Sequence, residues 1–418
     1  MTQVRSALDT YLDRRAVTGP WRLEGDTEGP FSGAVVIPAL AESARLSETL
    51  ESLAANPLEA LARWQIVVVV NNSARASEEQ KADNLLTLAR LRREAEQGSV
   101  RLAWIDAASP GREVPARTAG AGSARRIGFD LALAGLQASH RPLLVALDAD
   151  TLVDASYLPA IEAHFARRDT GGAVLPLWHQ REGSAEARQA IETYELYLRA
   201  YPLGLQLAGS PYAYLTVGSA MACTADAYVR AGGMNRRRAG EDFYFLQQLA
   251  KTSGVAQVSG TVVRPSARTS SRTPFGTGPS MARLLSGDGP DLPFFDPRIF
   301  EILRCWLKLA CSHPERDTSV LLEKAEEIHP EMAAFLEGAG FESAWSAMQR
   351  NGRGLVSPGG FHGWFDGLKT FRLVRHLSQK AYPPGEPVSM VTPLMAAAGR
   401  AAGQEIAELN DQIFAFWE

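Results

Sequence analysis

The sequence predicts an α/β protein, with a mainly parallel sheet flanked by helices and a helical C-terminal region. Two observations predict this. Between about residues 31 and 263, short runs rich in β-branched residues alternate with longer helical patterns, which is typical of parallel strands joined by helices. Because these runs are apolar throughout, both faces of the sheet are expected to be buried. After about residue 290, apolar residues recur at steps of three and four, which indicates helices.

Short apolar runs bounded by turn residues mark the expected strands. They are Ala34–Ile37, Gln65–Val70, Arg101–Ile105, Leu143–Leu147 and Ala173–Leu175, with a further core strand over Val255–Val263. Helical patterns that begin or end near Ser, Asn, Asp, Pro or Gly lie between these strands. They cover Ser43–Ala55, Glu78–Gln97, Ser123–Ser139 and Tyr157–Arg168.

Three regions are expected along the chain. Residues 1–30 form a helical N-terminal extension, with a helix over Ser6–Ala16, and a linker that contains Gly and Pro. Residues 31–285 form the α/β domain and residues 286–418 the helical region. Four tryptophans of that last region are expected to be core residues, because aromatic residues at helical spacing usually pack inside. They are Trp306, Trp345, Trp364 and Trp417.

Composition narrows the function classes. The 418 residues carry a net charge of -4 and no long Lys/Arg block, so the surface that neutralises phosphates in nucleic-acid binding is missing. Three cysteines without Cys-x-x-Cys spacing indicate neither a disulfide framework nor a zinc site. Because neither a signal peptide nor a membrane span is indicated, we expect a cytoplasmic protein. An amphipathic helix of the last third is compatible with peripheral membrane contact.

Polar residues follow three of the expected strands. Pro38 and Glu42 follow the first, Asn71 and Asn72 the second, and Asp148-Ala149-Asp150 the fourth. In a parallel sheet these strand ends meet at one edge, where open α/β sheets bind ligands. Paired carboxylates at a strand end suit a hard cation that takes its other ligands from phosphate and water. We therefore expect Mg²⁺ or Mn²⁺ at Asp148 and Asp150.

Four motifs in this order and spacing resemble the inverting family 2 glycosyltransferases of the GT-A fold, a Rossmann-like fold. The resemblance covers roughly residues 31–275. Its motifs here are Val36-Ile37-Pro38-Ala39-Leu40-Ala41-Glu42, Val70-Asn71-Asn72-Ser73, Asp148-Ala149-Asp150 and Gly240-Glu241-Asp242. The resemblance implies a metal-dependent enzyme that moves a sugar from a nucleotide-sugar donor to a hydroxyl acceptor.

The resemblance implies that Pro38, Glu42, Asn71 and Asn72 hold the donor's nucleoside. Family members usually have Asp where this chain has Asn71-Asn72. Asn both accepts and donates hydrogen bonds, so the choice between uracil and guanine stays open, although a UDP-sugar is favoured. For either Asn, a purely structural role in the turn is the alternative.

Three arginines are candidates for donor contact. Arg125 lies in a Gly-rich stretch that opens a helix, where backbone N–H groups and a guanidinium favour a diphosphate. Its neighbour Arg126 is either a second contact or a solvated helix residue. Arg268 and Arg272 lie in a basic, hydroxyl-rich loop that is suited to close over the diphosphate, and a simply solvated loop is the alternative.

On the acceptor side, the resemblance implies that Asp242 is the general base. Glu241 would bind acceptor hydroxyls or orient that base. Gly232 and Gly233 are interpreted as letting the backbone pass close to a bound sugar. His362, in the last third, is a further candidate for the acceptor side.

The sequence therefore predicts a metal-dependent, inverting glycosyltransferase. Two alternatives stay open at this point. A sugar-nucleotide nucleotidyltransferase shares the sheet and the metal carboxylates, but it requires a Gly-rich loop with a Lys after the first strand, which this chain lacks. A catalytically silent module that binds nucleotides or glycans would keep the cleft without the base.

Overall fold

A computed structural model describes residues 6–98, 100–136, 141–235, 237, 239–270, 276–287 and 292–417. The chain divides into two compact units. The first runs to Arg181 and resumes over Thr216–Gly278, and the second contains Glu182–Leu215 and Pro279–Trp417. The segment from residue 182 to 215 thus groups with the C-terminal helices. The domain boundaries at residues 30 and 285 stay predictions.

The strands of the first unit are short and mostly apolar. They are β1 (Leu23–Gly25), β2 (Gly33–Ala39), β3 (Trp64–Asn71), β4 (Leu102–Ala107), β5 (Leu143–Ala146), β6 (Thr151–Val153), β7 (Gly172–Val174), β8 (Met221–Thr224), β9 (Val255–Gln257) and β10 (Val263–Pro265). The main sheet has the order β1-β4-β3-β2-β5-β8-β7-β9, and β10 pairs with β6 in a second small sheet. In the main sheet β1 and β8 run antiparallel to their neighbours, and the other pairs are parallel. The mainly parallel sheet is confirmed.

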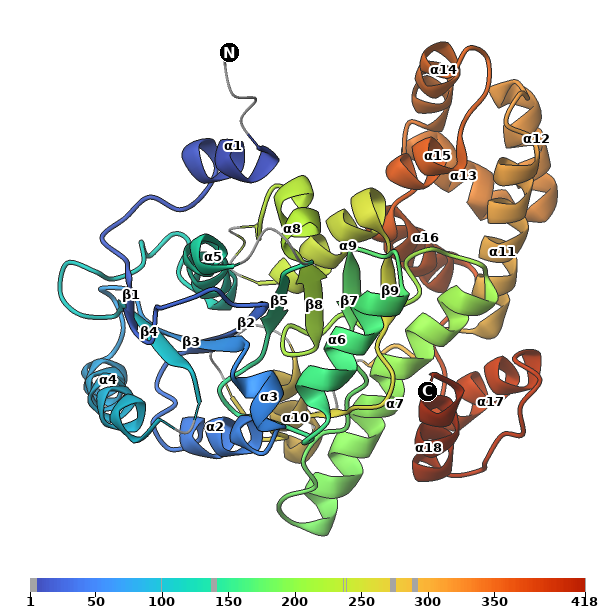
Figure 1. The fold of residues 1–418 in the computed structure, drawn as a ribbon. Helices are drawn as coiled ribbons and strands as arrows, with labels where there is room; N and C mark the ends of the chain where they lie inside the picture. Colours follow the sequence, from blue (N-terminus) through green and yellow to red (C-terminus); the bar gives the residue numbers. More distant parts are fainter. Residues whose placement is uncertain are drawn as a thin grey trace, which may run out of the picture. The chain divides into compact units, whose positions relative to one another are not determined.

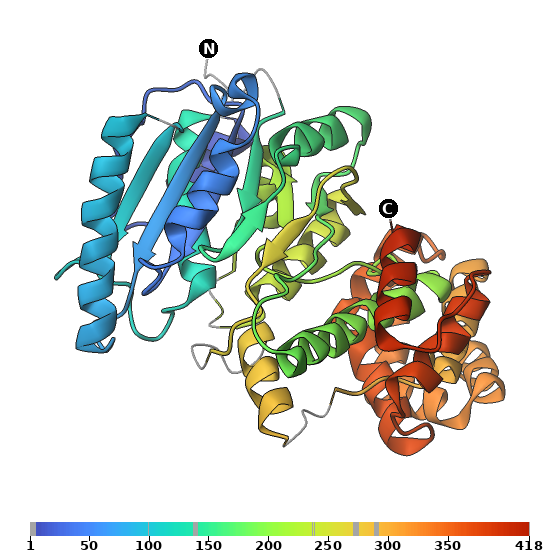
Figure 2. The ribbon, with the colours of Figure 1, turned by 90° about the horizontal axis from the view of Figure 1, so that it is seen from below.

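Helices cover both faces of this sheet. They are α1 (Ala7–Arg14), α2 (Leu46–Ala54), α3 (Leu58–Leu61), α4 (Glu78–Gln97), α5 (Ala121–Ala132), the 3-10 turn η1 (Leu133–Gly135), α6 (Tyr157–Arg167), α8 (Ala225–Ala231) and α9 (Glu241–Ser253). Figure 1 shows α5, α8 and α9 on one face and α2, α3 and α4 on the other. The view from below in Figure 2 shows α2 and α4 in front of the strands. Strands β2 and β3 are almost fully buried between these layers.

Local sequence rules account for several of the helix starts. Ser6 caps α1 and Ser77 caps α4, and each side chain accepts a hydrogen bond from the backbone N–H three residues further along.

The prediction of a single strand over Val255–Val263 was wrong, because β9 and β10 are separate strands that belong to different sheets. Strand β8 was missed, since its four residues follow a Gly-Ser turn without an extended β-branched run.

The second unit is helical. It contains α7 (Ala185–Leu207), α10 (Thr277–Ser286), α11 (Pro297–Ser312), α12 (Thr318–Ile328), α13 (Pro330–Gly338), α14 (Phe341–Asn351), α15 (Pro358–Trp364), α16 (Gly367–Lys380), α17 (Pro387–Ala397) and α18 (Ile406–Trp417). Trp306 and Trp345 are fully buried in its core, as predicted, and Trp364 and Trp417 pack against that core. Within the described residues, none of the helices has the length and apolar composition needed to cross a bilayer.

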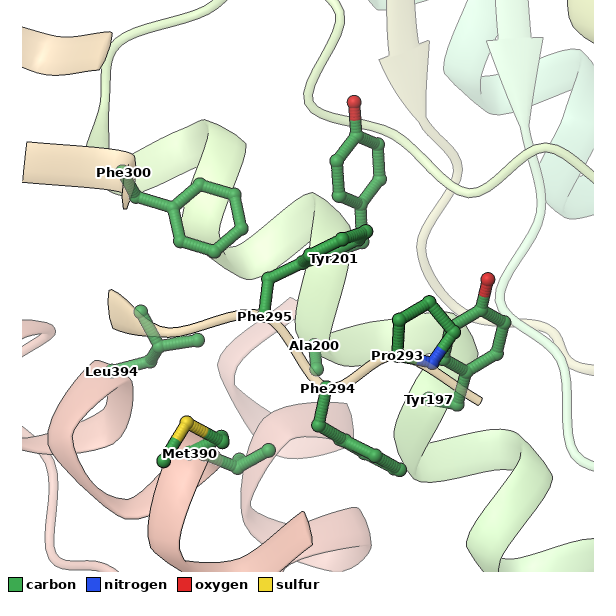
Figure 3. Close-up of a pocket in the computed structure, with 10 residues that line it drawn as sticks. Tyr197, Ala200, Tyr201, Pro293, Phe294, Phe295, Phe300, Met390 and Leu394 are labelled. Atoms are coloured by element: carbon green, nitrogen blue, oxygen red, sulfur yellow. The ribbon is translucent and has the colours of Figure 1, made fainter. Parts of the chain in front are cut away.

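Aromatic side chains surround a small cavity in the second unit. Figure 3 shows Tyr197 and Tyr201 of α7 beside Phe294, Phe295 and Phe300. The cavity measures about 10 Å³, which leaves room for one water molecule at most. This cluster is therefore core packing with no space for a sugar ring.

Candidate active site

The predicted strand ends meet at one edge of the sheet. Because β2 pairs in parallel with both β3 and β5, the carboxyl ends of the three strands lie side by side. The turn after β5 carries Asp148 and Asp150, the loop after β2 carries Glu42, and Asn71 closes β3. The structure therefore places the candidate donor residues at the edge where parallel α/β sheets bind ligands.

Arg125 is the centre of a buried charge network. Its Nη2 donates to Oδ1 of Asp148 at 2.5 Å, and its Nη1 donates to Oε1 of Glu241 at 2.5 Å. Burial alone would lower the pKa of Arg125, but Asp148 and Glu241 outweigh burial and raise it, so the guanidinium stays charged. A Cβ at Gly218 would lie 2.5 Å from Nη2 of Arg125, so only glycine leaves room for this guanidinium.

Asp242 lies beside this network in the first turn of α9. Its Oδ1 accepts the backbone N–H of Phe243 at 2.8 Å. Burial, followed by the neighbouring charge of Glu241, raises the pKa of Asp242 from 3.8 to about 6, against the opposing effect of Arg125. A carboxylate with a pKa near 6 is ionised at neutral pH and still basic enough to accept a proton. Asp242 thus has the acid–base properties of a general base.

Arg268 makes a second ion-pair cluster, with Asp150 and Glu42. Its Nε donates to Oδ2 of Asp150 at 3.0 Å, and its Nη2 pairs with both Asp150 and Glu42. Gln180 supports the same turn, because its Nε2 donates to the carbonyl of Asp150 at 3.0 Å. The sequence did not single out Gln180, which follows β7 as part of an irregular segment. Arg272 lies outside the described residues.

The two asparagines after β3 differ in their surroundings. Asn72 is held on all sides: its Nδ2 donates to the carbonyls of Ser73 and Ala108, and its Oδ1 accepts from Asn84 at 2.7 Å. Among the described residues, the side-chain amide of Asn71 takes part in no hydrogen bond. Asn71 therefore has an amide available to a ligand, whereas Asn72 has a structural role.

Asn84 links the first two loops of this edge. Besides Asn72, it binds the backbone N–H of Ala41 through Oδ1 at 2.9 Å. It is fully buried in α4. The sequence signal for Asn84 is a polar residue on the buried face of an otherwise regular helix, and the sequence analysis missed it.

Pro38 lies within β2 and pairs in register with Val69 of β3 at the same edge of the sheet.

The carboxylates of Asp148 and Asp150 suit a divalent cation that takes its remaining ligands from a substrate. Within the described part of the chain, no three His, Cys, Asp or Glu side chains are grouped as in a protein-only metal cage. Asp148 and Asp150 offer carboxylate oxygens from one turn, and Mg²⁺ is typically bound by one or two carboxylates together with substrate phosphates. The residues therefore fit a metal that arrives with a diphosphate.

Two other places contain none of the predicted donor or base residues. A pocket of about 310 Å³ lies among α1, η1 and α8, lined by Leu8, Leu133 and Val229 among others.

His362 lies in the second unit, where its backbone carbonyl accepts a hydrogen bond from the hydroxyl of Tyr212. Burial lowers the pKa of His362. Its acceptor role stays a prediction.

Fold and sequence together define the class of this protein. The mainly parallel sheet, flanked by helices on both faces and followed by a helical region, is that of the GT-A fold. The model of the glycosyltransferase-like family 2 matches residues 30–275. This chain belongs to that family and is a glycosyltransferase.

Searches among known proteins add distant similarities. Staphylococcus aureus TarS 1-349 in complex with UDP-GlcNAc is 11% identical, with a TM-score of 0.39, over 92% of this chain and 91% of that one. The mannosyltransferase PcManGT from Pyrobaculum calidifontis, in complex with GDP-Man and Mn²⁺, is 15% identical, with a TM-score of 0.37, over 94% of each chain. No curated protein matches this sequence.

Proposed function

We propose that this glycosyltransferase moves a sugar from a nucleoside diphosphate donor, with UDP-sugars favoured, to a hydroxyl acceptor, with inversion at the anomeric carbon and the help of a divalent metal. One observation carries the proposal. The guanidinium of Arg125 joins Asp148, in the turn after β5, to Glu241, the neighbour of the candidate base. Donor-side and acceptor-side carboxylates therefore belong to one charge network.

On the donor side, Asn71 supplies the amide that reads the base. Uracil has an N3–H donor next to a carbonyl oxygen. The oxygen of one side-chain amide can accept from this N3–H while its NH₂ group donates to the carbonyl oxygen. Guanine offers the same pair at N1–H and O6, so a test has to include both bases. Pro38 and Glu42 border the nucleoside from the loop after β2.

Asp148 and Asp150 would hold the metal. When bound, the metal acts as a Lewis acid on the leaving diphosphate. Arg268, which pairs with Asp150 and Glu42, lies within reach of the same region and supplies a guanidinium for phosphate oxygens. Two carboxylates without added positive charge would repel a diphosphate, so Arg268 and the metal serve the same electrostatic need.

On the acceptor side, Asp242 accepts the proton of the attacking hydroxyl. The hydroxyl oxygen forms the new bond to the anomeric carbon while the bond from that carbon to the diphosphate breaks, and its electron pair leaves with the diphosphate. Attack from the opposite face inverts the configuration. Arg125 keeps Glu241 in place beside the base, and burial together with the charge of Glu241 raises the pKa of Asp242.

Release of nucleoside diphosphate tests this function. The protein is incubated with UDP-glucose, UDP-N-acetylglucosamine or GDP-mannose, Mn²⁺ and a panel of sugar alcohols or water as acceptor. We expect release from one nucleotide class, a product of inverted anomeric configuration by NMR, and loss of release in Asp242→Asn. Release that is unchanged in Asp242→Asn, or a product of retained configuration, would contradict the proposal.

A further inference from the structure

Within the first unit, a buried carboxylate connects the N-terminal helix α1 to α5 and α8. Asp130 of α5 is 3% exposed. It accepts from the hydroxyls of Tyr11 at 2.8 Å and Tyr228 at 2.7 Å, and from the backbone N–H of Val17 at 2.8 Å. Burial raises the pKa of Asp130. Three donors on one carboxylate fix α1 against α5 and α8.

Arg126 completes this cluster and connects it to the acceptor-side segment. Its Nη1 donates to the carbonyl of Met234 at 2.5 Å, and its Nη2 donates to the carbonyl of Arg15 at 2.5 Å. Its Nε lies 3.4 Å from Asp130. Arg126 is 8% exposed, so it is a buried link and not a solvated helix residue.

The paired glycines before Met234 make room for α1. A Cβ at Gly233 would lie 2.0 Å from the hydroxyl oxygen of Tyr11, and one at Gly232 would lie 2.9 Å from Nη1 of Arg15. Both glycines also have φ near +81°, a region that other residues rarely adopt. The N-terminal segment, and not a bound sugar, therefore makes the close approach to these two glycines.

From Met234 the link continues to the start of α9. Asn235, the next residue, donates through Nδ2 to the carbonyl of Glu241 at 2.7 Å. A second path runs through Tyr228, whose ring packs edge-on against Phe245 of α9 with centroids 5.8 Å apart. The position of the Glu241–Asp242 pair therefore depends on Arg126 along two short chains of contacts.

We infer that Arg126 is a positioning residue for the general base, and that α1 acts through Asp130 to fix Arg126. The inference rests on the proposed role of Asp242. Arg126 contacts two backbone carbonyls and Asp130, and it contacts neither the strand-end carboxylates nor Asn71. Its loss should therefore lower turnover while donor affinity is kept, because catalysis is more sensitive to small displacements than binding is.

The test compares kcat with donor affinity in the full-length protein. Turnover is measured as release of nucleoside diphosphate from the nucleotide sugar that the wild type uses. The Kd of that nucleoside diphosphate is measured by calorimetry. In Arg126→Gln we expect kcat to fall by about tenfold or more, with a Kd within about twofold of the wild type. Arg126→Lys should recover part of kcat, and Tyr11→Phe should lose less than Arg126→Gln. Arg230→Gln, which removes an exposed pair with Asp226 in α8, is the control and should match the wild type.

Wild-type kcat in Arg126→Gln, or a Kd that weakens in parallel with kcat, would overturn the inference. Hydrogen exchange checks the coupling independently of turnover. Amides of residues 241–246 should exchange faster in Arg126→Gln than in the wild type, while those of β2 and β3 stay unchanged. Equal exchange at 241–246 would also overturn the inference. A wild type that neither binds nor turns over any nucleotide sugar would instead refute the proposed function.

Discussion

Arg268 donates through Nε to Oδ2 of Asp150 at 3.0 Å, so a guanidinium already neutralises the carboxylate that we propose as a metal ligand. Asp150 and Asp148 lie in one turn, yet they pair with different arginines, Arg268 and Arg125. Of the two arginines, Arg125 is almost fully buried, whereas the side chain of Arg268 is 30% exposed. Arg268 is therefore the partner that can exchange with an incoming cation.

The first prediction concerns competition for Asp150. Arg268→Gln removes the guanidinium, so Mn²⁺ alone should bind more tightly than in the wild type, while nucleoside diphosphate should bind more weakly, on the order of tenfold, for lack of a charged phosphate contact. Calorimetry of each ligand separately measures both effects. Arg264→Gln, on the neighbouring β10, is the matched control. Weaker Mn²⁺ binding in Arg268→Gln would refute the competition.

The second prediction separates the two asparagines. Asn72→Ala should lower the free energy of unfolding by about 1–3 kcal/mol, because it removes Oδ1 of Asn72, one of the two buried acceptors of the Asn84 amide. Asn71→Ala should change stability less and weaken nucleoside diphosphate binding more. Urea unfolding and calorimetry on both variants give the comparison. If Asn71→Ala instead lowers stability more and Asn72→Ala weakens binding more, the assignment of Asn71 to the nucleotide base is wrong.

The third prediction is the pH dependence of transfer. Asp242 acts as a base only when ionised, and its pKa is raised to about 6. The rate should therefore be level above about pH 7 and fall roughly tenfold per pH unit well below pH 6. Donor affinity measured at each pH is the control. A rate that stays level down to pH 4.5 would exclude Asp242 as the base.

The fourth prediction follows from the same raised pKa. A carboxyl group whose pKa is higher in the folded state stabilises the fold while protonated, below about pH 4, and this contribution is lost as the pH rises through about 6. Asp242→Asn should therefore be more stable than the wild type at pH 8, by an amount on the order of 3 kcal/mol, and about equally stable at pH 4. Unfolding at the two pH values measures the difference. Lower stability of the variant at pH 8 would contradict the raised pKa of Asp242.

The parts predicted correctly from sequence are those that local patterns determine. Apolar runs such as Gln65–Val70 form buried strands, because β-branched apolar residues favour this conformation. The turn residues that follow these runs mark where each strand ends. Helix ends such as Ser77 follow from capping chemistry within four residues. These local rules were sufficient to place Asp148 and Asp150 in the turn after a strand, whereas the proposed role of Asp242 comes from the family resemblance.

The partners of these residues could not be predicted in this way. Arg125 and Glu241 are 116 positions apart, and Arg268 and Glu42 are 226 apart. Such pairs depend on how the whole sheet is assembled, which composition and periodicity do not encode. Likewise, Gly233 is used for the close approach of Tyr11, from a helix that the sequence presented only as an extension.

The central claim is that the edge formed by β2, β3 and β5 binds a nucleoside diphosphate together with a divalent metal. Calorimetric titration of UDP and GDP, each with Mn²⁺ and with EDTA, tests it most directly, in the wild type and in Asp150→Ala, with the surface variant Asp226→Asn as control. We predict tight binding of one diphosphate that requires Mn²⁺, is lost in Asp150→Ala and is kept in Asp226→Asn. Binding that is unchanged in EDTA and in Asp150→Ala, or no binding of either diphosphate to the wild type, would contradict the account.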